Sequence, residues 1–371
     1  MWLRLITIAA SVGTTVVLGF LVAQYIDLLT GAATSFVYAI LPYSIYYGRT
    51  ILPDPSMVFW SVLSLWLVGR GKSIWWTLFA AVAGALAFLS KPMAVFLLLP
   101  VPYILFKQFG VSKKTVLRSF LYLLISVVPL LLWRKWILQF PEGIPVSEWL
   151  LNGNGIRFKG AWFHWLFAVR LGDLILGFWG LILFGFGLVT APTKKEGWFF
   201  RWWILGALLY LIIFATGNVQ HDYYQILIIP VVAIFTAKGL ISLFRMKLPG
   251  ILVACISLIA MVGFSWFTIR TYYWINRPEI VEAGKLADAL LPKDAKVIAP
   301  YNGDTTFLYQ TQRQGWPEGF DIDKKIAMGA TAYVTVSPTD ADTETRDLAA
   351  KYTVLVRNDT FAIIDLTKLK K

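Results

Sequence analysis

The stretch Arg49-Thr50-Ile51-Leu52-Pro53-Asp54-Pro55 is a short polar segment between two apolar runs, residues 36–47 and 57–68. If both runs lie in a membrane, Asp54 is a carboxylate at the membrane boundary. Ionisable groups there are costly to remove from water, so they pair with a neighbour such as Arg49 and mark functional sites. A competing interpretation is that Asp54 only caps the following helix, with Pro55 in its first turn. Capping alone requires no nearby arginine.

The composition of the 371-residue chain is that of a multi-span membrane protein. Hydrophobic residues make up 58% of it, against about 45–50% in soluble domains. Fourteen of the 21 acidic residues lie from Glu279 onward, so the net charge of +13 belongs to the part before it. This distribution indicates membrane topology and anion binding, with no nucleic-acid partner. The single cysteine, Cys255, excludes an internal disulfide or a thiolate metal cluster.

Apolar runs predict about ten membrane spans. The first run ends near Ala23, and the others lie at about 32–47, 57–69, 74–89, 93–106, 117–133, 172–190, 202–216, 225–237 and 250–268. Basic residues gather on alternate short loops, which predicts that those loops face the cytoplasm and that both chain ends lie outside. The Asp54 segment, Lys91 and residues 133–171 and 217–225 then share the outer side.

Cations on this outer side are candidate ligands for a lipid phosphate. Arg157 and Lys159 lie in a segment rich in Trp and Gly, where Arg offers bidentate phosphate contacts and Lys a point charge. General attraction to anionic headgroups is an equally good interpretation of this pair. Lys91 stands between two apolar runs, and the alternatives for it are substrate contact and snorkelling from the end of a span.

The third polar segment carries His221, Asp222, Tyr223 and Tyr224. His221 and Asp222 could form a proton-transfer pair or supply two metal ligands, although adjacent residues on a helix do not face one another. The two tyrosines could stack on a sugar or belong to an aromatic belt at the membrane interface. A divalent metal held by Asp54 and His221 is left open.

The tail predicts a separate, small soluble α/β domain, so we divide the chain into residues 1–278 and 279–371. Residues 279–291 have helical apolar spacing. Buried strands are predicted at 295–299, 332–336, 353–356 and 361–364, and helices at 305–311, 322–329 and 342–351. Residues 357–360 predict a hairpin turn. The tail contains no Gly-rich phosphate loop and no nucleophile motif.

Three motifs in this order carry a resemblance to a known family. They are Arg49 to Pro55 after Ile-Leu-Pro-Tyr-Ser-Ile-Tyr-Tyr, then residues 88–92, Phe-Leu-Ser-Lys-Pro, and later His221 to Tyr224 with Pro230. The chain resembles the bacterial relatives of protein O-mannosyltransferases, which are polyprenyl-phosphate-sugar glycosyltransferases of C-type fold. The same group includes the aminoarabinose transferases of lipid A.

The resemblance implies a plasma-membrane enzyme of the bacterial inner membrane with its C-terminal domain outside the cytoplasm. It implies inverting transfer of a mannose-like hexose or an aminopentose from a polyprenyl-phosphate donor to a protein, lipid or glycan acceptor. Asp54 matches the family's second acidic motif, and substrate-binding roles fall to Arg49, Lys91, Arg157, Lys159 and residues 221–224. The family's base in the first outer loop has no match. The resemblance therefore predicts an N-terminally truncated chain, a partner supplied separately, or an inactive protein.

Two other classes of function stay open at this point. One is a transporter or flippase for lipid-linked sugars, although transporters keep their sites at mid-span and the polar residues here gather at one face. The other is an assembly subunit whose tail binds a protein partner.

Overall fold

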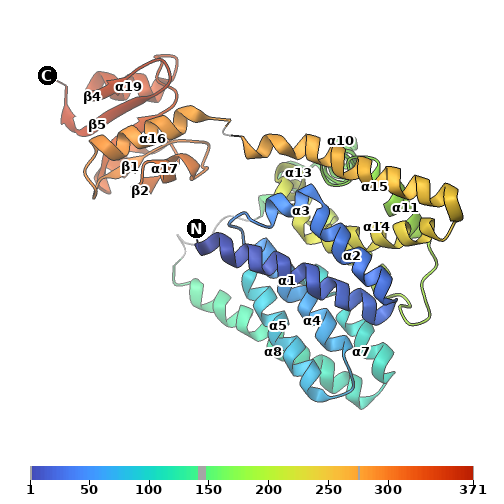
Figure 1. The fold of residues 1–371 in the computed structure, drawn as a ribbon. Helices are drawn as coiled ribbons and strands as arrows, with labels where there is room; N and C mark the ends of the chain where they lie inside the picture. The colour runs from blue at the N-terminus through green and yellow to red at the C-terminus, as the bar shows by residue number, and fades with distance from the viewer. Residues whose placement is uncertain (1, 141–147, 275, 371) are drawn as a thin grey trace. The chain divides into compact units, whose positions relative to one another are not determined.

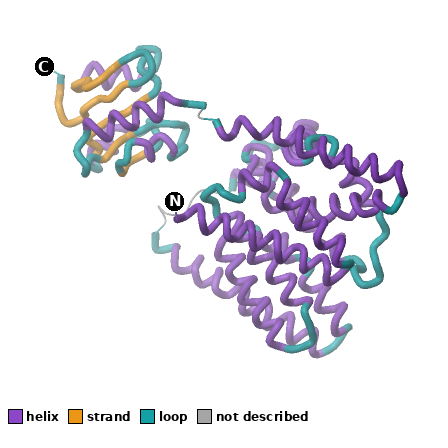
Figure 2. Tube along the Cα trace, in the orientation of Figure 1, coloured by secondary structure: helices purple, strands orange, loops and turns teal. Residues whose placement is uncertain are grey.

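The computed structural model describes the chain except for residues 1, 141–147, 275 and 371 (Figure 1). Helices make up the first part, and a sheet with helices follows (Figure 2). Contacts divide the chain into two compact units, Met1–Thr271 and Tyr272–Lys371. The predicted boundary lies seven residues later, between 278 and 279, and the membrane and outer-side assignments of the two parts stay predictions.

The first unit is built from helices of very different lengths. They are α1 (Trp2–Tyr25), α2 (Leu28–Ile40), α3 (Pro42–Tyr47), α4 (Asp54–Gly69), α5 (Ile74–Ser90), α6 (Ala94–Leu98), α7 (Val101–Phe109), α8 (Lys113–Ile137), α9 (Trp149–Asn152), α10 (Gly160–Phe163), α11 (Gly180–Val189), α12 (Phe199–Ile213), α13 (Ala215–Gln220), α14 (Ile229–Phe244) and α15 (Lys247–Ile269). A π-helix, η2 (His164–Ile175), and a 3₁₀-helix, η3 (Asp222–Ile228), complete the unit. A second 3₁₀-helix, η4 (Arg270–Tyr273), contains the boundary to the second unit.

The long helices lie side by side in the order α8, α5, α4, α1, α2, α14 and α11, as Figure 1 shows in part. Helix α14 is buried along nearly its whole length, because an apolar sequence on all sides fits the interior of a bundle. Two glycines let it touch α11. A Cβ on Gly187 would lie 1.7 Å from the carbonyl oxygen of Phe235, and one on Gly239 would lie 1.7 Å from that of Leu183. Small residues allow such close backbone contact between membrane helices.

Four helical segments of the described residues are long and apolar enough to cross a membrane: Arg4–Tyr25, Lys113–Ile137, Asp222–Phe244 and the segment that begins at Lys247 and contains α15. A fifth span results if Gly160–Ile175 and Gly180–Val189, which meet at 114°, count as one broken span. Shorter apolar helices, such as Ile74–Ser90 and Phe199–Ile213, lie beside them. These helices support a membrane protein, whereas the count of about ten spans stays a prediction.

The second unit contains the strands β1 (Lys296–Ile298), β2 (Gln314–Trp316), β3 (Ala330–Thr335), β4 (Tyr352–Arg357) and β5 (Ala362–Leu369). They form one sheet in the order β2-β1-β3-β5-β4, with β1 parallel to β2 and β3, and β5 antiparallel to β3 and β4. Helices α16 (Pro278–Leu290) and α17 (Thr306–Gln310) supply residues to one core. A second core draws on α18 (Ile322–Ala327) and α19 (Thr343–Lys351).

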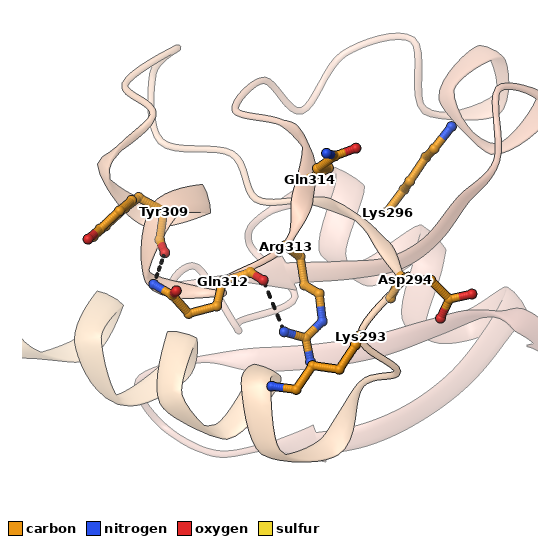
Figure 3. A pocket seen from close by; sticks show the side chains of 8 residues that line it. Lys293, Asp294, Lys296, Tyr309, Gln312, Arg313 and Gln314 are labelled. Atoms are coloured by element: carbon orange, nitrogen blue, oxygen red, sulfur yellow. Dashed lines mark hydrogen bonds between the residues drawn. The ribbon is translucent and has the colours of Figure 1, made fainter.

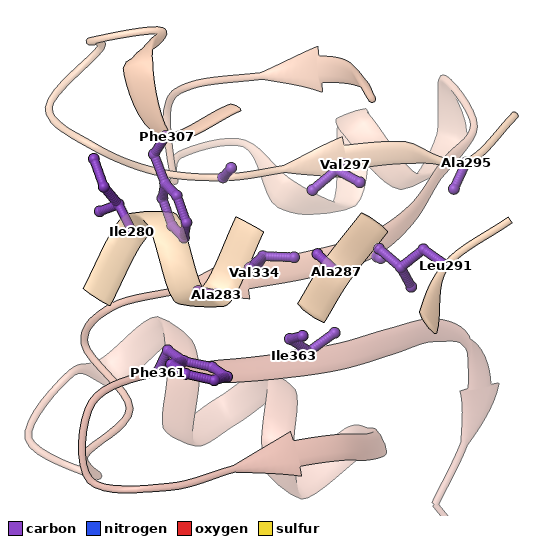
Figure 4. Packing of buried hydrophobic residues seen from close by; sticks show 12 residues of the cluster. Ile280, Ala283, Ala287, Leu291, Ala295, Val297, Phe307, Val334, Phe361 and Ile363 are labelled. Carbon is purple, nitrogen blue, oxygen red and sulfur yellow. The ribbon is translucent and has the colours of Figure 1, made fainter. Parts of the chain in front are cut away.

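The packing of this unit explains why its elements could be predicted. Ile280, Ala283 and Ala287 of α16 lie on one helix face against Val334 and Ile363 of the sheet (Figure 4). The predicted strands and helices are observed with ends shifted by a few residues, and the predicted hairpin joins β4 to β5. Strand β2 was not predicted, because its residues Gln-Gly-Trp show no apolar run, whereas β1 lies within the apolar run 295–299.

Candidate active site

Asp54 is buried at the start of α4, with 1% of its surface exposed. Pro53 and Pro55 bracket it, and proline suits the first turn of a helix because its fixed φ matches the helix and its missing N–H is not needed there. Asp54 is itself the first helical residue, and the preceding cap residue, Pro53, makes no side-chain cap bond. The capping interpretation therefore does not explain this carboxylate, although the helix N-terminus does favour its negative charge.

The partner of Asp54 is Lys91, the residue that follows the end of α5. The Lys91 ammonium donates to Asp54 Oδ1 over 2.8 Å, and the exposed fractions of the two side chains are 15% and 1%. Asp54 Oδ2 is buried and has no hydrogen-bond partner among the described residues. A buried carboxylate oxygen without a donor is costly, so this oxygen is a candidate acceptor for a hydroxyl of a bound molecule.

Two aromatic rings lie close to the Lys91 ammonium. Its Nζ is 4.3 Å from the ring centre of Tyr224 and 5.6 Å from that of Tyr223. Cation–π attraction holds the Lys91 ammonium in place and leaves its N–H groups available as hydrogen-bond donors. The structure therefore brings together Asp54, Lys91, Tyr223 and Tyr224, which the sequence placed in three separate segments.

A second ion pair lies next to these tyrosines. Arg170 Nη1 is 3.8 Å from Asp222 Oδ2, and Arg170 Nη2 donates to the Val219 carbonyl over 3.2 Å. The Nε of Arg170 is buried without a hydrogen-bond partner among the described residues. The Tyr43 hydroxyl donates to the backbone carbonyl of Asp222 over 2.6 Å and so fixes this turn. Arg170 lies on the π-helix η2, and π-helical turns are frequent at functional sites.

Sequence reasoning missed Arg170 and Tyr43. Arg170 is a lone arginine in the run Phe167-Ala168-Val169-Arg170-Leu171, and a single cation within an apolar run was the available signal. Tyr43 belongs to the helix end quoted for the resemblance, but one tyrosine among several carries no signal of its own.

His221 lies against aromatic rings at the entrance to η3. Its ring centre is 5.7 Å from that of Trp149 and 5.4 Å from those of Tyr223 and Tyr224. Burial lowers the pKa of His221 below its usual value; nearby Asp222 opposes this shift, and the cations Lys91 and Arg170 add to it. No group of three or more His, Cys, Asp or Glu side chains that could hold a metal occurs among the described residues, and the predicted metal stays open.

The remaining predicted cations lie elsewhere. Arg49 lines an open groove of about 320 Å³ beside Ser11, Tyr38 and Ser44, with its guanidinium 5.8 Å from the Tyr46 ring. The structure thus gives Asp54 the lysine as partner rather than Arg49, although both were predicted for one site.

Arg157 is engaged by the backbone. Its guanidinium donates to the carbonyls of Ile212 at 2.8 Å, Ile213 at 3.0 Å and Leu151 at 3.1 Å. The first two carbonyls belong to the end of α12, where helical carbonyls lack partners within the helix. Lys159 is exposed before α10. The structure thus gives Arg157 a capping role, and a phosphate role for the pair stays a prediction.

The second unit has a separate open cavity of about 600 Å³, lined mainly by polar side chains (Figure 3). Arg313 at its base is buried and donates to the carbonyls of Pro292 and Leu291 and to the Asp288 carboxylate. Hydrogen bonds from Lys293 and Arg313 lower the pKa of Asp288. These contacts tie the end of α16 to β2.

Comparisons with known proteins address the fold. Residues 1–109 match the model of the dolichyl-phosphate-mannose-protein mannosyltransferase (PMT) family. This segment contains Asp54 and Lys91 but not Arg170 or residues 221–224. Among curated proteins, none matches the sequence.

Among solved structures, ArnT from Cupriavidus metallidurans in the apo state is 12% identical, with a TM-score of 0.61, over 97% of this chain and 83% of that chain. The same protein bound to undecaprenyl phosphate is 13% identical, with a TM-score of 0.61, over 98% of this chain and 83% of the other. The archaeal oligosaccharyltransferase AglB from Archaeoglobus fulgidus, in complex with an inhibitory peptide and a dolichol-phosphate, gives a TM-score of 0.49 at 9% identity, over 98% of this chain and 63% of that chain. The predicted resemblance is confirmed: the first 109 residues match a mannosyltransferase family domain, and the chain has the fold of ArnT, a C-type glycosyltransferase.

Proposed function

We propose that the chain is an integral-membrane glycosyltransferase that moves a sugar from a polyprenyl-phosphate donor to an acceptor at the outer face of the membrane, with inversion. The observation that carries the proposal is the cluster of two ion pairs, Asp54 with Lys91 and Arg170 with Asp222, around Tyr223 and Tyr224. The fold shared with ArnT supports glycosyl transfer in general. The sugar, a hexose or an aminopentose, and the acceptor belong to the proposal.

In this reaction the bond between the anomeric carbon and the phosphate oxygen breaks, and its electron pair leaves with the polyprenyl phosphate. The acceptor hydroxyl oxygen forms the new bond to the anomeric carbon and gives its proton to a base. Negative charge grows on the departing phosphate, so preorganised cations lower the barrier most. Lys91 and Arg170 are these cations: both are mostly buried, and Arg170 Nε has no competing partner among the described residues.

The geometry also limits the role of Asp54. Inversion requires the acceptor to attack from the face of the sugar opposite the phosphate. Asp54 is hydrogen-bonded to Lys91, so a phosphate on Lys91 places Asp54 on the leaving-group side. We therefore assign Asp54 the roles of positioning Lys91 and accepting a hydroxyl of the donor at Oδ2, and we assign the base to none of the residues in this cluster.

Binding of polyprenyl phosphate, the product of transfer, tests the phosphate site. The full chain in nanodiscs is titrated with a short-chain polyprenyl phosphate, and Lys91→Gln and Arg170→Gln are compared with the wild type. A hydrogen bond to a charged group contributes about 1.5–3 kcal/mol, so each variant should bind at least about tenfold more weakly. Arg245→Gln is the matched control, because Arg245 is an exposed arginine whose partner, Asp27, is also exposed.

Three results would count against the proposal in different ways. Equal affinity for polyprenyl phosphate in all four proteins would show that the phosphate does not bind at this cluster. Equal losses in the control and the two site variants would indicate a general effect of charge. Site-specific binding without transfer of sugar from a polyprenyl-phosphate sugar in membranes would favour the transporter or the assembly subunit.

A further inference from the structure

A basic cavity of about 610 Å³ lies at the N-terminal end of α8. Lys113 and Lys114 begin that helix, Lys72 comes from the loop between α4 and α5, and Arg118 lies one turn further along α8. None of the three lysines has an ion-pair partner among the described residues, and the described lining includes no carboxylate. Three unneutralised ammonium groups around one hollow favour an anion within it.

The cavity is held in shape by Arg118, which is 8% exposed. Its guanidinium donates to the Ser73 carbonyl over 3.0 Å, to the Thr77 hydroxyl over 2.8 Å and to the carbonyl of Lys72. It also lies 4.4 Å from the ring centre of Phe109. Arg118 thus holds the loop that carries Lys72 against α8. Lysines from two segments therefore line the same cavity, and among the described residues no carboxylate pairs with them there.

The surroundings indicate where the anion comes from. Lys113–Ile137 is a candidate membrane span with only 17% of its apolar window buried inside the protein. A helix that spans the bilayer in this way would have its first residues at a membrane boundary. Val111 is 93% exposed, and Val116 is 70% exposed. Apolar side chains flanking lysines at the end of a span are suited to the region where acyl chains meet headgroups.

We propose that this cavity binds the phosphate of an anionic phospholipid headgroup. The lysines supply charge from two sides, and the first turn of the 25-residue helix α8 adds the positive end of its dipole. The site is independent of the proposed transfer reaction, because it shares no residue with the cluster around Asp54 and Lys91. It would anchor the start of α8 and the loop between α4 and α5 to the leaflet that carries anionic lipid.

Native mass spectrometry of the purified full chain tests this site with phosphatidylglycerol and, for comparison, zwitterionic phosphatidylcholine. One lysine near an anionic surface contributes about fivefold in affinity. Phosphatidylglycerol binding should therefore weaken about twentyfold in Lys113→Gln/Lys114→Gln and about fivefold in Lys72→Gln. Lys194→Gln/Lys247→Gln is the matched control, because both lysines are exposed and Lys247 also begins a candidate span; it should change binding less than about twofold.

Each alternative has its own signature. If the control variant loses as much phosphatidylglycerol affinity as the site variants, the effect is one of net charge alone, and the proposed site is overturned. A loss in the α8 variant without one in Lys72→Gln would leave only the helix end and overturn the cavity. If millimolar inorganic phosphate displaces the lipid, the cavity binds a phosphate group, but the proposal that this phosphate belongs to a phospholipid is overturned. Equal binding of both lipids by the wild type would overturn the requirement for an anion.

Discussion

Removal of one charge from the Asp54–Lys91 pair should affect stability very differently from removal of both. Lys91→Met leaves the Asp54 carboxylate buried, with 1% of its surface exposed and no cation beside it. Breaking a buried ion pair in this way costs about 3–5 kcal/mol. Asp54→Asn leaves Lys91, which is 15% exposed and faces two tyrosine rings. That ammonium can reach water and keeps its cation–π contacts, so we expect a cost of about 1–2 kcal/mol.

The double variant Asp54→Asn/Lys91→Met separates stability from binding. Neither charge remains, so the stability should return to within about 1 kcal/mol of the wild type, since apolar replacement of a buried pair is often neutral. Polyprenyl-phosphate binding should stay as weak as in Lys91→Met, because the phosphate has lost its cation in both.

The assay is reversible unfolding in mixed micelles for all four proteins, with polyprenyl-phosphate binding measured on the same samples. A coupling energy near zero between the two substitutions would refute the buried pair as the source of the cost. A larger loss of stability for Asp54→Asn than for Lys91→Met would refute the assignment of Asp54 as the more deeply buried charge. Recovery of binding in the double variant would refute Lys91 as the phosphate ligand.

Three further predictions test the packing of α11 and α14, the capping role of Arg157 and the contacts of Asp288. Gly239→Leu should lower the free energy of unfolding by about 1–3 kcal/mol or more, because its Cβ would lie 1.7 Å from the Leu183 carbonyl oxygen. The control in the same unfolding assay is Gly185→Leu in α11, where a Cβ meets open space. Arg157→Ala should cost about 1–3 kcal/mol, because three backbone carbonyls lose their donor, whereas Lys159→Ala should leave the thermal midpoint unchanged. The pKa of Asp288 is lowered in the folded state. The Asp288 carboxylate therefore stabilises the fold fully above its ordinary pKa of about 3.9, and this stabilisation is lost as the pH falls through the lowered pKa. Unfolding of residues 272–371 followed by circular dichroism should show the loss of stability at low pH, and Asp288→Asn should abolish this pH dependence.

The fold could be predicted where one sequence pattern decides one element. Apolar runs predicted the long helices because a bundle in a membrane hides backbone polar groups within each helix. Pro100 and Pro102 explain one difference: the run at 93–106 forms α6 and α7, with Pro100 at the break. The π-helix η2 could not be predicted, because its extra residue per turn leaves no mark in the apolar pattern.

The site could be predicted only segment by segment. Asp54 and Lys91 were each recognisable as charges at the ends of apolar runs, but their direct contact joins residues 37 positions apart. The hydrogen bonds from Arg157 to the α12 carbonyls could not be predicted, because the sequence does not show which backbone groups lie beside its side chain. Which charges pair depends on how the helices pack, and this information is absent from the spacing along the chain.

Pairing across segments makes donor binding and folding depend on the same residues. Asp54 and Lys91 join the start of α4 to the end of α5, and Arg170 and Asp222 join η2 to η3. The second pair is longer, at 3.8 Å, and Asp222 is 25% exposed, so water weakens its attraction more than that of the first pair. The first pair is shorter and more deeply buried, so it fixes the position of Lys91. In the proposed function, Lys91 is therefore the more firmly held of the two cations that would face the departing phosphate, and Arg170 is the less tightly paired one.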